Sequence, residues 1–111
     1  MPEPPPKIRL TTTTRLVLDL FLATDPDNPL WGYRITEETG LGPGTVYPLL
    51  ERLEKAGWIT GTWETGLPEN RPRRRLYTLS GTGRQEYAAL QTARGRGLLP
   101  HWGWVPGGAQ R

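Results

Sequence analysis

Four arginines close together in the chain, Arg71, Arg73, Arg74 and Arg75, have the clearest capacity to bind a ligand. Guanidinium groups bind phosphate through charge and paired hydrogen bonds, so such a cluster predicts a polyanionic ligand. The charge of the whole 111-residue chain is uneven in the same sense. Residues 1–69 hold six Lys and Arg against ten Asp and Glu, and residues 70–111 hold eight against one. A basic surface that meets only solvent is the alternative.

The sequence contains few of the residue types that catalysis needs. The chain has no cysteine, one histidine, His101, and one serine, Ser80. Zinc ribbons, iron–sulfur ligation and thiol catalysis are therefore excluded, and no pair of nucleophile and base stands out. The glycine-rich segment 40–44 lacks the Gly-Lys-Thr/Ser that completes a phosphate-binding loop. We expect no enzyme, no catalytic residue, no metal site and no cofactor.

The hydrophobic pattern predicts the elements that position the arginines. Its period is 3.6 residues up to Gly57 and 2 residues directly after it. It predicts, in chain order, helices over 12–24, about 30–39 and about 42–56, strands over 58–63 and 73–79, and a helix over 81–94. Gly40 is placed to end the second helix and Ser80 to cap the last one. Pro48 lies inside the third helix, so that helix either begins late, near Thr45, or bends in its first turn.

This order of elements predicts an α+β fold, mainly α: a winged helix-turn-helix with three helices, a two-stranded β-hairpin wing and a C-terminal helix. We expect an irregular proline-rich arm over 1–10, a winged-helix domain over 11–80, a C-terminal helix over 81–94 and an irregular tail over 95–111. No run of residues is apolar and long enough to span a membrane, and the first residues do not resemble a signal peptide. A cytoplasmic protein without a membrane partner is expected.

In a winged helix the third helix enters the major groove of DNA by its N-terminal end, while the wing reaches the DNA backbone or the minor groove. The predicted DNA contacts are therefore Arg34, Gly44, Thr45, Tyr47, Arg71, Arg73, Arg74 and Arg75. Tyr47 lies on the charged face of its helix, where an aromatic ring has no core to fill; packing on the second helix is the alternative. Pairing with Glu37 or Glu38 on the surface is the alternative for Arg34.

A second apolar stripe on the first predicted helix suggests a contact beyond the core. Leu18 and Leu22 lie roughly opposite the stripe expected to face the core. A small domain covers one such stripe, so the second predicts contact with a terminal helix or with another subunit; burial inside the chain is the alternative. With Tyr87 and Leu90 of the last helix, these leucines form the predicted dimerisation surface.

Three segments of the chain resemble the PadR family of bacterial transcriptional regulators. They are Gly32-Tyr33, Gly44–Ile59 and Arg74–Arg84, and the similarity covers roughly residues 15–92. The resemblance implies a homodimeric, repressor-type protein that binds a palindromic DNA operator and is often released by a small molecule or another signal. The chain departs from the family pattern after the wing, where Gly95 and Gly97 leave only residues 81–94 for the helix that would support dimerisation.

The expected tail carries an aromatic pair, Trp102 and Trp104, that has no evident place in the core. Packing on a helix, lining a dimer groove and forming a small-molecule effector site are all open for this pair. His101 lacks a second histidine or a close pair of carboxylates, so it is not expected to bind a metal. The sequence thus predicts a DNA-binding transcriptional regulator, with a winged-helix protein-interaction module that does not bind DNA as the alternative.

Overall fold

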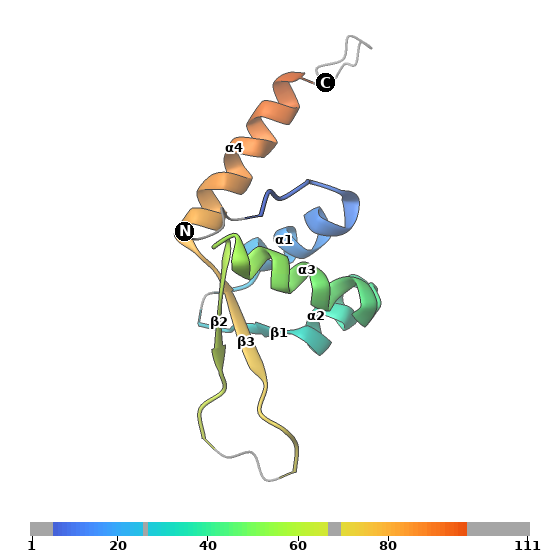
Figure 1. Ribbon diagram of the computed structural model, residues 1–111, viewed down its shortest axis with the longest axis vertical. Coiled ribbons are helices and arrows are strands. Elements are labelled where there is room, and N and C mark those ends of the chain that lie inside the picture. Colours follow the sequence, from blue (N-terminus) through green and yellow to red (C-terminus); the bar gives the residue numbers. More distant parts are fainter. Residues whose placement is uncertain (1–5, 26, 67–69, 98–111) are drawn as a thin grey trace.

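A computed structural model describes residues 6–25, 27–66 and 70–97 of the chain. Its elements in chain order are α1 (Thr12–Ala23), β1 (Leu30–Trp31), α2 (Gly32–Thr39), α3 (Pro43–Lys55), β2 (Ile59–Trp63), β3 (Arg75–Leu79) and α4 (Gly81–Gly97). Helices α1, α2 and α3 lie together, the hairpin of β2 and β3 projects from one end, and α4 projects from the other (Figure 1). The predicted winged helix is confirmed.

The sheet of the described residues has three strands where the sequence predicts two. β3 lies in the middle, between β1 and β2, and both pairings are antiparallel. In β1, Leu30 faces Tyr77 across the ladder. The pattern predicts a helix from about residue 30, and this was wrong: Leu30 is buried beside the sheet, and α2 begins only at Gly32. A strand of two residues is too short to show a hydrophobic period in the sequence. It forms because it pairs with β3.

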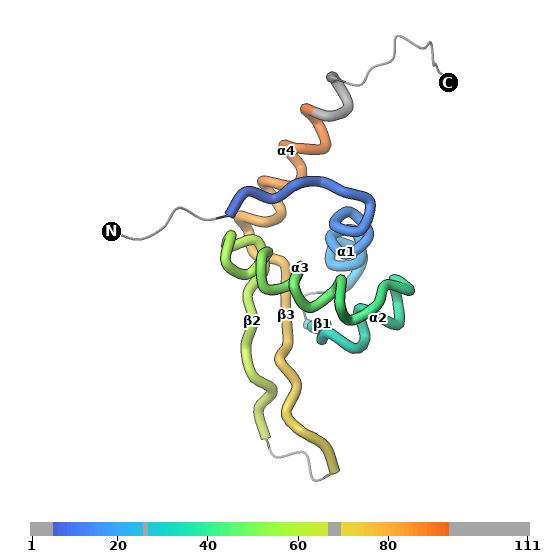
Figure 2. Tube along the Cα trace, turned by 45° about the vertical axis from the view of Figure 1, so that its right-hand side comes forward, coloured from blue at the N-terminus to red at the C-terminus, as the bar shows by residue number. Residues whose placement is uncertain are grey.

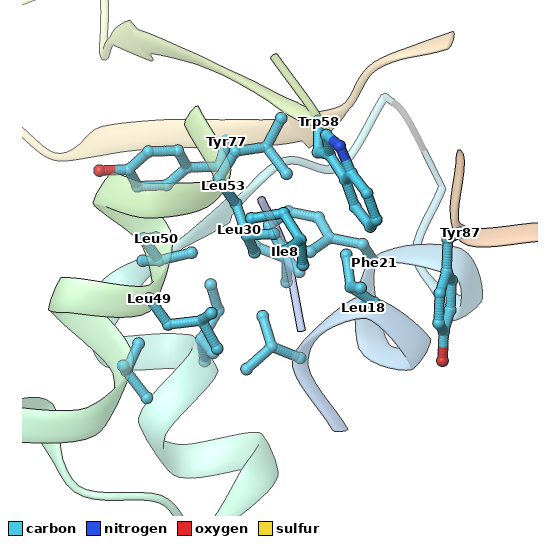
Figure 3. Close-up of a cluster of buried hydrophobic side chains, with 14 residues drawn as sticks. Ile8, Leu18, Phe21, Leu30, Leu49, Leu50, Leu53, Trp58, Tyr77 and Tyr87 are labelled. Atoms are coloured by element: carbon cyan, nitrogen blue, oxygen red, sulfur yellow. The ribbon is translucent and has the colours of Figure 1, made fainter. Parts of the chain in front are cut away.

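The core lies where the three helices meet the sheet (Figure 3). Its buried apolar residues are Ile8, Val17, Leu18, Phe21, Leu30, Ile35, Val46, Leu49, Leu50, Leu53, Trp58, Ile59, Tyr77 and Tyr87. Ile8 is a surprise, because it belongs to the predicted irregular arm. Residues 6–10 indeed form neither helix nor strand, but Ile8 is only 8% exposed and holds this segment on the core.

Helix α3 runs through Pro48 without a late start. It begins at Pro43, whose missing N–H costs nothing in a first turn. Pro48 lies on the exposed side, and the buried side consists of Val46, Leu49, Leu50 and Leu53. Gly40 ends α2 with a positive φ of 76°, as predicted, because the left-handed conformation favours glycine.

Helix α4 is fixed at its start and runs further than predicted. The Ser80 hydroxyl accepts a hydrogen bond from the Gly83 N–H at 2.9 Å, which confirms the predicted cap. The helix continues through Gly95 to Gly97, so the predicted end at residue 94 was wrong. Figure 2 shows it leading away from the body of the molecule. Within the described ranges, no helix is both long and apolar enough to cross a membrane.

Candidate nucleic-acid interface

The beginning of α3 is an exposed helix end. Residues 42–45, Tyr47 and Pro48 all lie at the surface, and the first turn carries no acidic side chain. Tyr47 is 50% exposed. Its ring lies directly against Gly32, where a Cβ atom would come within 2.6 Å of the ring Cζ. Tyr47 therefore packs on the start of α2, the alternative left open by the sequence, and still offers half of its surface to a ligand.

Tyr47 and the arginine cluster line one hollow, which we call the wing groove. It has a volume of about 350 Å³. Its lining residues are Trp31, Gly32, Tyr33, Tyr47, Arg71, Pro72, Arg73, Arg74, Arg75 and Tyr77. The structure thus brings together five of the eight predicted contacts, while Gly44 and Thr45 lie at the neighbouring helix start. Four aromatic rings and four guanidinium groups therefore line this hollow together.

Two of the four arginines are held by carboxylates. Arg71 donates to both carboxylate oxygens of Glu64, at 2.7 and 3.0 Å. Arg75 donates to Glu54 of α3 at 2.6 Å. The second pair passes over Gly61 of β2, where a Cβ would lie 2.9 Å from the Glu54 carboxylate. Arg75, at the start of β3, therefore ties the wing to α3.

The other two arginines are available for a ligand. Arg73 is exposed, and no ion pair within the described ranges includes it. The Arg74 guanidinium lies 4.1 Å from the centre of the Trp31 ring. Arg34 lies 5.6 Å from the centre of the same ring, and it forms no ion pair with Glu37 or Glu38. Stacking on an aromatic face leaves the N–H groups at the edge of a guanidinium free to donate.

Trp31 is the functional candidate that was missed from the sequence. The predicted helix from residue 30 concealed it, because a strand, not a helix, presents this ring to the wing. The sequence signal that could have identified Trp31 is its position directly before Gly32-Tyr33, one of the segments that resemble the PadR family. Trp31 positions two guanidinium groups, one from α2 and one from the segment before β3.

The pair of Arg71 and Glu64 predicts an observable titration. Chiefly through its hydrogen bonds, Arg71 lowers the pKa of Glu64 from 4.5 to about 2. Because the folded pKa lies below the unfolded one, this stabilisation is complete above pH 4.5 and is lost as the pH falls toward 2. We expect Arg71→Gln to return the Glu64 pKa toward 4.5, measured by NMR titration of its side-chain carboxyl. An unchanged pKa would show that the two side chains do not pair in solution.

The predicted dimerisation residues fall into two groups. The assignment of Leu18 and Tyr87 to a dimer surface was wrong, because both lie in the core of the chain, at 0% and 1% exposure. The Tyr87 hydroxyl donates to Asp19 of α1 at 2.6 Å. Leu22 is 40% exposed, and Leu90 is partly buried against the core. Leu16 of α1 is also exposed.

Some of the candidates lie outside the described residues. Trp102 and Trp104, with the suggested effector site, and His101 all belong to residues 98–111. Within the described part of the chain, no three His, Asp or Glu side chains come together in a way that would hold a metal ion.

The fold and the groove define a winged-helix protein with a cationic wing. The chain belongs to the transcriptional regulator PadR-like family, whose family model matches residues 21–89. It is therefore a transcriptional regulator by family, and the resemblance noted in the sequence is confirmed. The comparison with curated proteins found no match.

Solved structures share the fold at low sequence identity. A PadR-like transcription factor from Bacteroides fragilis is 22% identical, with a TM-score of 0.60 over 77% of this chain and 84% of that one. A PadR-like regulator from Bacillus cereus is 21% identical, with a TM-score of 0.55 over 77% and 82%. A zinc-responsive MarR family member from Lactococcus lactis is 23% identical, with a TM-score of 0.56 over 87% and 67%. These likenesses concern the fold alone.

Proposed function

We propose that the protein binds duplex DNA as a homodimer and represses transcription from a palindromic operator. The N-terminal half of α3 lies in the major groove, and the wing lies on the DNA backbone. The observation that carries the proposal is the shared wing groove, because Tyr47 and the arginine cluster face one hollow beside an exposed helix start. A single DNA duplex can meet both at once.

The charges along α3 favour docking by its N-terminal end. Its first turn has no acidic residue, whereas Glu51 and Glu54 lie further along the helix. Arg52 and Lys55 offset these two carboxylates, so phosphate is attracted chiefly by the start of the helix, where the helix dipole is positive. At that start, the exposed residues Thr45 and Tyr47 carry hydroxyls that can donate to or accept from base edges or phosphate oxygens.

The wing supplies the phosphate contacts. Arg73 and Arg74 carry positive charge that no carboxylate neutralises among the described residues. The ion pair between Arg75 and Glu54 holds the wing at a defined angle to α3, so these two cations keep their place relative to the helix. Cations fixed in this way neutralise phosphates and release counterions, which makes binding dependent on salt.

Dimerisation rests on exposed apolar side chains of α1. Leu16 and Leu22 are 43% and 40% exposed, so each offers apolar surface to a second chain. A twofold axis at this surface would place the two α3 helices about 34 Å apart, one turn of DNA, and would require a palindromic site. The same leucines would serve the alternative function, a protein-interaction module.

The test is binding of the full chain to the DNA upstream of its own gene, with a scrambled duplex of equal length and composition for comparison. Fluorescence anisotropy at several NaCl concentrations measures the binding constant. Its logarithm should fall linearly with the logarithm of the salt concentration, with a slope of about −0.9 per neutralised phosphate. Sedimentation of the complex should show two chains per duplex. Salt-independent capture of a protein partner, without DNA binding, would establish the alternative.

A further inference from the structure

A second basic hollow lies on the other flank of α3, and we call it the arm groove. It has a volume of about 500 Å³ and lies between the N-terminal arm, the start of α1 and the start of α3. Three of its lining side chains are cations: Lys7 and Arg9 from the arm, and Arg52 from α3. Four of the other lining residues are threonines, and among the described residues no acidic side chain lines the groove. None of these three cations was assigned a role from the sequence.

The three cations are exposed and form no ion pair with a described residue. The arm that carries two of them is also held in place. Ile8 points into the core between Lys7 and Arg9, so its two neighbours point outward. The Thr11 N–H donates to the Arg9 carbonyl at 2.9 Å, which fixes the chain where it enters α1. The ordering cost of placing these two charges is therefore reduced before any ligand binds.

The arm groove and the wing groove flank the exposed face of α3. Gly44, Thr45 and Pro48 border the arm groove, and Tyr47, one residue before Pro48, borders the wing groove. The arm crosses on the side of α3 away from the hairpin, as both views show (Figures 1 and 2). A helix in the major groove, which is about 12 Å wide, has a phosphate backbone on each side.

Resting on the proposed DNA binding, we propose that the arm groove binds the DNA backbone strand opposite to the one that the wing contacts. Lys7, Arg9 and Arg52 donate to phosphate oxygens there, and α3 is held between two basic flanks. These contacts carry no sequence information, so they add affinity and fix the position of α3 without choosing the bases.

The test replaces charge and keeps the fold. Deleting the arm would remove Ile8 from the core, so the variant is Lys7→Gln with Arg9→Gln in the full chain. The matched control is Lys55→Gln with Arg84→Gln, which removes the same charge from exposed residues outside the arm groove. Affinities for the upstream duplex and for a scrambled duplex are measured by anisotropy over a series of NaCl concentrations.

The arm variant should bind both duplexes about tenfold more weakly, and the ratio between the duplexes should stay the same. Its salt slope should fall by about 0.9 for each phosphate that the arm no longer neutralises. Equal slopes for the arm variant and its control, while the wild-type protein binds both duplexes, would overturn the arm groove and leave the proposed function standing. No salt-dependent binding by the wild-type protein would overturn both. Hydroxyl-radical footprinting of the arm variant should show weaker protection on one strand in each half-site, and the twofold axis of the dimer makes this the opposite strand in the other half-site.

Discussion

Replacing Arg73 and Arg74 together by alanine should weaken binding to the upstream duplex by about a hundredfold, because each change removes a charge-assisted hydrogen bond to phosphate. The salt slope should fall by about 0.9 for each phosphate that the wing no longer neutralises. Neither side chain is held by a carboxylate among the described residues, so no carboxylate is left unpaired. Anisotropy titrations at fixed NaCl concentrations measure both quantities.

The control for this variant is Lys55→Ala with Arg84→Ala, which changes the net charge equally at exposed positions outside the wing groove. The control should bind nearly as well as the wild-type protein. If both double variants lose affinity to the same extent, then overall charge, and not the position of the wing arginines, drives the interaction. That outcome would remove Arg73 and Arg74 from the interface.

Replacing Gly83 by alanine should cost about 2–3 kcal/mol in the free energy of unfolding. A Cβ atom at this position would overlap the backbone carbonyl of Trp58, which cannot turn aside as a flexible side chain can. Either α4 or the residue just before β2 must move, and Ser80 is hydrogen-bonded to both. Its hydroxyl accepts from Gly83 and lies 2.9 Å from that same carbonyl. Urea denaturation, followed by circular dichroism, measures the destabilisation.

Gly81 provides the matched control, because it lies two residues earlier in the same helix and a Cβ there meets only open space. Gly81→Ala should leave stability unchanged or raise it by up to about 1 kcal/mol, since alanine is the better helix former. Equal unfolding midpoints for the two variants would show that α4 does not pass as close to Trp58 as the structure places it.

Features encoded by adjacent residues could be predicted from the sequence. Gly40 ends a helix because of its own backbone freedom, and Ser80 caps one because its hydroxyl reaches a nearby N–H. The stripe of apolar residues in α3 also needs only its spacing. Features that depend on distant partners were missed or misassigned. β1 exists because β3 pairs with it, and Ile8 is buried because the core leaves room for it.

The candidate site shows the same division. The arginine cluster and the exposed Tyr47 could be identified from residue type and spacing. Which arginines pair with carboxylates and which remain available for a ligand could not be predicted. Arg75 meets Glu54 across 21 residues of sequence, and Arg74 stacks on a tryptophan far from it in the chain. Leu18 was assigned to a dimer surface because a helix pattern shows two apolar stripes without showing which is covered. The packing of α4 and the core determines which stripe is covered.

The most direct test is site-specific photo-crosslinking to the upstream duplex, because the central claim is that the start of α3 and the wing face the same DNA. The photoreactive residue p-benzoylphenylalanine would replace Tyr47, Arg73 or, as the control on α4, the exposed Glu86 in three separate full-length proteins. We predict crosslinks from positions 47 and 73 to neighbouring nucleotides of one half-site, and none from position 86. Crosslinks from position 86 without any from positions 47 and 73 would contradict this claim.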